Sequence, residues 1–122
     1  MIVGIGTDLL ENERIEKACL RESFVKRIFT EKEQELIRQN PKKASGNFAV
    51  KEAVSKVFGT GIRQMRLTDI EVLRDELGKP YVNLYNNALK KANELNITNI
   101  HVSISNTREY TIAYVVAETV GV

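Results

Sequence analysis

The sequence predicts an α+β fold with a mostly antiparallel sheet and a long central helix. On a helical wheel, residues 46–61 place their apolar side chains on one broad arc, which is typical of a helix that faces a core. Alternating polarity at residues 69–75, 80–84 and 97–105 predicts strands. The short connections at 76–79 and 106–109 join strands in pairs, so we expect most neighbouring strands to run in opposite directions.

The composition indicates a single domain over residues 1–122. The chain has 18 Lys or Arg and 16 Asp or Glu, a net charge of +2, whereas nucleic-acid-binding domains present a clearly basic face. Cys19 is the only cysteine, which excludes an internal disulfide and predicts a buried thiol in a reducing compartment. The sequence shows neither a signal peptide nor a membrane span. We therefore expect a cytoplasmic protein without nucleic-acid or membrane partners.

Residues 2–8 predict a strand in which Gly4 and Gly6 share one face. Glycines on one face of a strand mark a place where backbone or ligand comes close. Asp8 ends that face, where its carboxylate can point into the space beside the glycines. Asp8 also precedes Glu11 by three residues, so it could instead cap the next helix.

Residues 11–28 are helical in composition, with a break expected near Ser23. Arg14, Lys17 and Arg21 form a stripe that is either a solvated face or a docking surface for an acidic partner. Phe24 is expected to contact the core or a partner. A capping box at residues 30–33 opens a helix that reaches Gln39, and residues 42–46 predict a polar connector.

The polar arc of the central helix carries Lys51, Glu52 and Lys56, together with Phe48. Glu52 and Lys56 could form a simple surface pair at i,i+4. A large aromatic residue on the same arc suggests instead that this side contacts a ligand, a partner or another subunit. Gly59 is placed to end the helix.

The C-terminal half predicts a hairpin at 69–84, a short helix at 86–96 and strands at 97–105 and 110–117. Residues 112–117 are apolar on both faces of their strand, which predicts burial on both faces by helices or by another subunit.

Four segments together resemble one family. They are GIGTD at 4–8, FAVKEAVSKVFGTG at 48–61, DIE at 69–71 followed by GKP at 78–80, and HVSISNTREY at 101–110. In this order the chain is similar to the holo-acyl-carrier-protein synthases, which are small bacterial 4′-phosphopantetheinyl transferases. The resemblance covers essentially the whole chain.

The resemblance implies an α+β homotrimer with active sites at the subunit interfaces. It implies Mg²⁺-dependent transfer of 4′-phosphopantetheine from coenzyme A to a serine of apo acyl carrier protein. The second product would be adenosine 3′,5′-bisphosphate, and the activity would support fatty acid biosynthesis.

The resemblance also assigns roles to residues. Asp8 and Glu52 would bind Mg²⁺, and Lys56 would neutralise phosphate or protonate the leaving group, so these three are the expected catalytic residues. The base that activates the serine stays open between Glu52 and a Mg²⁺-bound water. The expected coenzyme A contacts are Lys51, Lys56, Gly59, Thr60, Gly61, Lys79, Pro80 and Asn106. The expected carrier-protein contacts are Arg14, Arg21, Phe24 and Phe48.

Two positions depart from the family pattern, since Asn47 replaces the usual Arg and Asn106 the usual His. Both positions are expected near coenzyme A, so each departure removes a cationic contact to phosphate. The alternative function is therefore a module that binds coenzyme A or carrier protein without turnover.

Overall fold

The computed structural model describes residues 1–59 and 65–120. The elements in chain order are β1 (Ile2–Glu11), α1 (Asn12–Ala18), α2 (Glu22–Ile28), α3 (Glu31–Gln39), α4 (Lys43–Val57), the 3₁₀ helix η1 (Leu67–Asp69), β2 (Ile70–Arg74), β3 (Pro80–Leu84), α5 (Asn86–Glu94), β4 (Asn99–Asn106) and β5 (Tyr110–Glu118).

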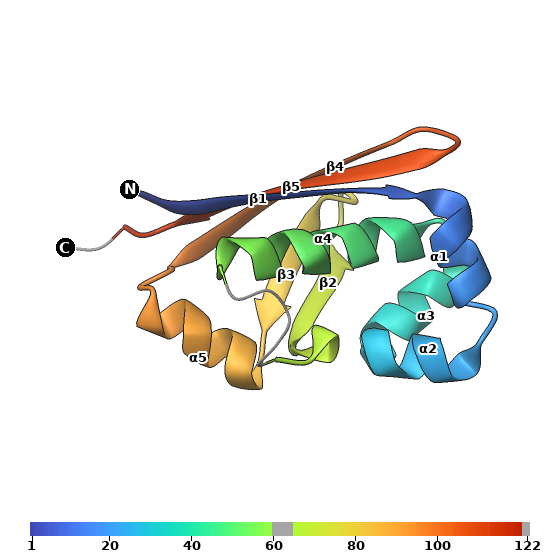
Figure 1. Cartoon of the computed structure of the whole chain (residues 1–122), viewed down its shortest axis with the longest axis horizontal. Helices are drawn as coiled ribbons and strands as arrows, with labels where there is room; N and C mark the ends of the chain where they lie inside the picture. Colours follow the sequence, from blue (N-terminus) through green and yellow to red (C-terminus); the bar gives the residue numbers. More distant parts are fainter. Residues whose placement is uncertain (60–64, 121–122) are drawn as a thin grey trace.

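The α+β class is confirmed, and every strand pair in the described residues is antiparallel. The strands divide into two sheets, one with the order β1-β5-β4 and one formed by β2 and β3. Figure 1 shows α4 running along the three-stranded sheet, with α1–α3 gathered at one end of the molecule and α5 at the other. Since α4 contacts β1, β5 and β2, it lies between the two sheets.

The glycine face of β1 is occupied by the backbone of α4. A Cβ atom on Gly6 would lie 1.9 Å from the carbonyl oxygen of Ala53, and one on Gly4 would lie 3.2 Å from Cγ1 of Val57. A separation below 3.0 Å from a backbone atom leaves no room for a side chain. Of the two alternatives for these glycines, a close approach of backbone is therefore confirmed, and the expectation that they leave space for a ligand is wrong.

Three expected boundaries differ from the structure. Strand β1 continues to Glu11, so Asp8 lies within the strand opposite Ala113 and does not cap the next helix. The predicted helix at 11–28 is two helices, with the break at 19–21 instead of near Ser23. Residues 43–46 belong to α4 and are not a connector.

Several local predictions are confirmed. Thr30 accepts a hydrogen bond from the Glu33 N–H (3.3 Å), and Glu33 accepts one from the Thr30 N–H (3.1 Å), which completes the capping box. Gly59 follows α4 with φ of 76° and donates to the carbonyl of Lys56. Thr60 and Gly61 lie outside the described residues.

Strand β5 is buried on one face only. Ala113, Val115 and Ala117 are fully buried. On the opposite face Tyr114 is 53% exposed, beside Ile5 (63%) and Leu9 (64%) of β1. The three-stranded sheet therefore carries an open apolar face. No helix in the described ranges has the length and apolar composition needed to cross a membrane.

Candidate active site

Strand β1 and helix α4 bring Asp8, Glu52 and Lys56 together. The close approach at Gly6 places Asp8, two residues further along the same strand face, beside the polar side of α4. Lys56 Nζ lies 3.2 Å from Asp8 Oδ1 and also donates to the carbonyl of Thr7 (2.8 Å). Residues that are 48 positions apart in sequence thus form one charged cluster.

Glu52 has a raised pKa, chiefly because burial disfavours its carboxylate and also because the negative charge of Asp8 lies nearby. The charges of Lys56 and Arg14 act in the opposite direction. Two neighbouring carboxylates in a partly buried site form a donor set that suits a divalent cation.

Among the described residues, no group of three or more His, Cys, Asp or Glu could hold a metal ion. Mg²⁺ needs no such group, because it is typically bound by one or two carboxylates together with substrate phosphates and water. Asp8 and Glu52 therefore fit a cation that is shared with an anionic ligand.

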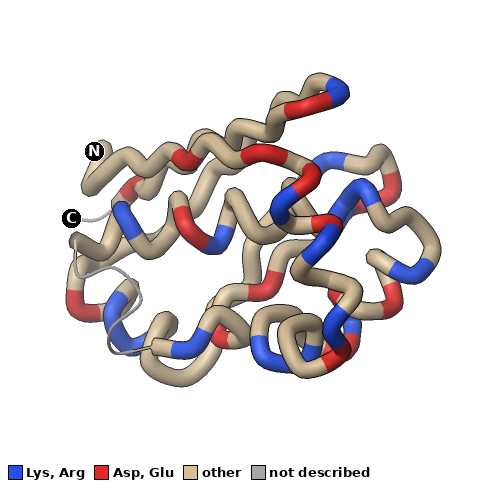
Figure 2. Tube along the Cα trace, turned by 45° about the vertical axis from the view of Figure 1, so that its right-hand side comes forward, with Lys and Arg blue, Asp and Glu red and all other residues tan. Residues whose placement is uncertain are grey.

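A first cleft of about 710 Å³ opens beside the two carboxylates. All four predicted carrier-protein contacts line it, although Arg14 lies on α1 and Arg21 immediately precedes α2. Lys17 lines it as well. Elsewhere along the chain, Figure 2 shows basic and acidic residues interspersed. The cleft therefore combines clustered cations with two half-buried aromatic side chains, Phe24 and Phe48.

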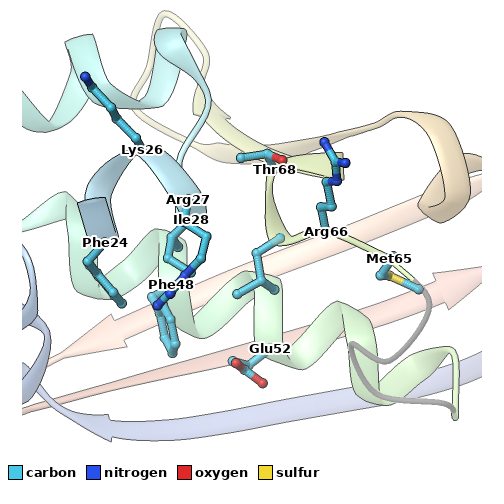
Figure 3. Close-up of a pocket in the computed structure, with 10 residues that line it drawn as sticks. Phe24, Lys26, Arg27, Ile28, Phe48, Glu52, Met65, Arg66 and Thr68 are labelled. Atoms are coloured by element: carbon cyan, nitrogen blue, oxygen red, sulfur yellow. The ribbon is translucent and has the colours of Figure 1, made fainter. Parts of the chain in front are cut away.

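A second cleft of about 690 Å³ shares Phe24, Phe48 and Glu52 with the first. Figure 3 shows Phe24 and Phe48 together on one side of this cleft and Met65, Arg66 and Thr68 on the other. The two phenyl rings stack with centroids 6.2 Å apart, so they lie between the two clefts.

Sequence analysis missed the second cleft and its cations, which are Lys26, Arg27 and Arg66. The first two lie in the last turn of a short helix, and Arg66 immediately precedes η1, so no sequence period links them. Only packing of α2 and η1 beside α4 brings them together.

The prediction that Lys51 contacts coenzyme A is wrong. Its side chain is fully buried, and its ammonium donates to Glu33 Oε1 (2.6 Å), to the carbonyl of Leu67 (2.8 Å) and to the carbonyl of Ile70. Burial lowers the pKa of Lys51 and raises that of Glu33, while the ion pair opposes both shifts. Lys51 therefore has no hydrogen left to donate to coenzyme A.

Asn47 is also fully buried, and its amide donates to Glu33 Oε2 (3.0 Å) and to the carbonyl of Val72 (2.9 Å). The expectation that position 47 lies at coenzyme A is wrong for this side chain, which contacts the core.

The other expected coenzyme A residues are dispersed over the chain. Gly59 follows the C-terminal end of α4. Lys79 and Pro80 belong to the β2–β3 hairpin, which lies near the other end of α4. This is shown by Arg74 of the hairpin, which would lie 3.5 Å from a Cβ atom on Gly46. Helix α4 has 15 residues and is therefore roughly 22 Å long. Asn106 ends β4 two residues after Ile104, whose Cδ1 would lie 3.3 Å from the same Cβ on Gly46, so its strand reaches the same end of α4 as the hairpin.

Comparison with known proteins gives a consistent result. The family model of the 4′-phosphopantetheinyl transferase superfamily matches residues 4–115. The holo-[acyl-carrier-protein] synthase of Lachnoclostridium phytofermentans is 57% identical over 120 residues, which cover 98% of each chain.

Two solved structures share the fold over nearly their whole length. The acyl carrier protein synthase of Plasmodium yoelii with ADP bound has a TM-score of 0.88 and 34% identity, and the match covers 99% of this chain and 98% of that one. The holo-(acyl-carrier-protein) synthase of Bacillus anthracis in complex with CoA (3′,5′-ADP) has a TM-score of 0.80 and 38% identity, covering 98% of each chain.

Proposed function

The chain belongs to the 4′-phosphopantetheinyl transferase superfamily, and we propose that it is a holo-acyl-carrier-protein synthase. It transfers 4′-phosphopantetheine from coenzyme A to a serine of apo acyl carrier protein and releases adenosine 3′,5′-bisphosphate. The names of its relatives and the nucleotides bound in the similar structures support this activity. The observation that carries the proposal is the Asp8–Glu52–Lys56 cluster beside a cleft lined with cations.

The reaction replaces one P–O bond by another. The serine oxygen attacks the phosphorus that carries the pantetheine arm, and the bond from that phosphorus to the bridging oxygen breaks. The serine proton passes to a base, for which the Glu52 carboxylate is available. Lys56 neutralises charge that develops on the departing bisphosphate. A Mg²⁺ ion held by Asp8 and Glu52 would neutralise the diphosphate of coenzyme A.

The carrier protein docks at the first cleft in this proposal. Arg14, Lys17 and Arg21 attract an acidic surface, and Phe24 and Phe48 supply apolar contacts. This arrangement delivers the serine of the bound carrier to the side of the cleft where Asp8 and Glu52 lie.

We further propose a single domain that assembles as a homotrimer in the cytoplasm, with active sites at the subunit interfaces. The open apolar face around Ile5, Leu9 and Tyr114 supports self-association, since exposed patches of this kind mark interaction sites. The separation of Lys79, Pro80 and Asn106 from Gly59, at opposite ends of α4, also supports it, because a neighbouring subunit could bring equivalent residues to each site.

The proposal is tested by following the nucleotide product. With apo carrier protein, coenzyme A and Mg²⁺, we expect adenosine 3′,5′-bisphosphate in amounts equal to the carrier modified. A carrier whose acceptor serine is replaced by Ala should give none. Binding of coenzyme A without any product would instead support the non-catalytic module. The burial of Asn47 weakens that alternative, because Asn47 is one of the two departures from the family pattern on which it was based.

A further inference from the structure

The sequence neighbours Lys51 and Glu52 point to different parts of the protein. Glu52 lines both clefts, whereas the Lys51 side chain is fully buried. Two of the three partners of the Lys51 ammonium are the backbone carbonyls of Leu67 and Ile70, which bracket η1. This ammonium therefore joins α4 to the segment that enters β2.

Glu33 fixes the ammonium in place. Its Oε1 atom accepts from Lys51 and from the Thr30 N–H (3.1 Å), and its Oε2 atom accepts from Asn47 and from the Val72 N–H (3.2 Å). With four donors around it, this buried carboxylate is fully hydrogen-bonded, which is the condition for a stable buried ion pair. The position of Lys51 is therefore set by α3, α4 and β2 together.

The segment that Lys51 holds is one wall of the second cleft. Met65, Arg66, Leu67 and Thr68 line that wall, opposite Phe48 and Glu52. Without the ammonium, the carbonyls of Leu67 and Ile70 would lose a buried donor, and the wall would lose its direct hydrogen bonds from α4.

We propose that Lys51 is a positioning residue, whose buried ammonium sets the width of the second cleft beside Glu52 by holding residues 65–68 against α4. This inference rests on the proposed function, which requires a coenzyme A site next to Glu52. The second cleft reaches Glu52 and combines the cations Lys26, Arg27 and Arg66 with apolar walls. Coenzyme A combines phosphates with a long uncharged arm, so the fit of this substrate depends on the width of the cleft.

The test compares Lys51→Met with Asn47→Ala in the full-length protein. Both variants remove a hydrogen bond to Glu33 from the same helix, but the second bond of the Asn47 amide goes to the carbonyl of Val72 and not to that of Leu67 or Ile70. We expect both variants to lower the melting temperature. Only Lys51→Met should raise the Michaelis constant for coenzyme A, by about tenfold, because small displacements of a substrate-binding wall are costly. Neither variant should change the Michaelis constant for carrier protein, because Leu67 and Ile70 do not line the first cleft, where the carrier protein is proposed to dock.

The inference would be overturned if the two variants changed the Michaelis constant for coenzyme A equally, or if Lys51→Met left that constant unchanged. If Lys51→Met does not fold, the double variant Lys51→Met/Glu33→Gln removes both charges and still leaves the two carbonyls without the ammonium, so the same increase is expected. A wild-type protein without transfer activity would refute the proposed function, whereas an active wild type with an unaffected Lys51→Met variant would refute only the positioning role.

Discussion

Lys56 Nζ lies 3.2 Å from Asp8 Oδ1, across the contact between α4 and β1. The ammonium and a divalent cation would therefore compete for the same carboxylate. A cation held by Asp8 would leave the Lys56 ammonium available to pair with phosphate. The ion pair thus couples cation binding by Asp8 to phosphate binding by Lys56.

Replacing Lys56 with Met should strengthen cation binding in the absence of coenzyme A. A partly exposed ion pair contributes about 0.2–1 kcal/mol, so the affinity for Mn²⁺, measured by electron paramagnetic resonance, should rise by a factor of about 1.4 to 5. The rate of transfer should fall, because the phosphate loses its cation. Lys17→Met is the control for Mn²⁺ binding alone, since Lys17 lines the same cleft but pairs with Glu13 and not with Asp8. Equal or weaker Mn²⁺ binding in Lys56→Met would contradict competition for Asp8.

Glu52 should titrate above the usual range of a glutamate. A carboxyl-carbon NMR titration should show the raised pKa of Glu52 in the wild-type protein. In the Asp8→Asn variant the pKa of Glu52 should be raised less, because this variant keeps the burial but removes the neighbouring charge. Since the folded protein binds this proton more tightly than the unfolded chain, the contribution of Glu52 to the free energy of unfolding decreases as pH rises through the raised pKa. A pKa that is unchanged by Asp8→Asn would mean that the two carboxylates do not interact.

Charge reversal at Arg14 should affect one substrate. The Michaelis constant for carrier protein should rise about tenfold in Arg14→Glu, because an attractive contact becomes repulsive, while that for coenzyme A changes little. Lys90→Glu makes the same change in charge on α5, at the other end of the molecule (Figure 1), and should leave both constants unchanged. A similar rise for both substrates in Arg14→Glu would argue against docking at the first cleft.

Gly6→Ala should separate β1 from α4. The added Cβ would lie 1.9 Å from a backbone oxygen, and strain of this kind costs about 1–3 kcal/mol or more. We expect a lower melting temperature and weaker Mn²⁺ binding, since Asp8 moves with its strand. Gly4→Ala meets Cγ1 of Val57 at 3.2 Å and its carbonyl oxygen at 3.5 Å, which are much longer contacts, and should be milder in both measurements. If the two variants behaved alike, the close approach at Gly6 would not position Asp8.

The sequence predicted those features whose signals are local. The capping box at Thr30 and Glu33 and the helix end at Gly59 depend on a few adjacent residues, and both are present. The direction of Lys51 could not be predicted in this way. A helical wheel gives the angle between Lys51 and Glu52, but only the packing of η1 and β2 beside α4 decides that Lys51 is fully buried while the half-buried Glu52 lines the clefts.

The sequence likewise predicted only part of the candidate site. Asp8, Glu52 and Lys56 were identified through the family resemblance, and the structure brings them together. Arg66 and Arg27 were missed because their segments reach the second cleft only through tertiary packing. Asn47 was misjudged because its partner, the buried carboxylate of Glu33, is 14 residues away and looks like an ordinary helix cap in the sequence.

Intact-mass spectrometry of an apo acyl carrier protein tests the central claim most directly. Incubated with this protein, coenzyme A and Mg²⁺, the carrier should gain the mass of one phosphopantetheine. EDTA should prevent the gain, excess Mg²⁺ should restore it, and Asp8→Asn should lower the rate about 100-fold, or about 2.7 kcal/mol in the barrier. An unchanged carrier mass, with coenzyme A binding still visible by calorimetry, would contradict transfer. Full activity of Asp8→Asn in EDTA would contradict the role of the two carboxylates.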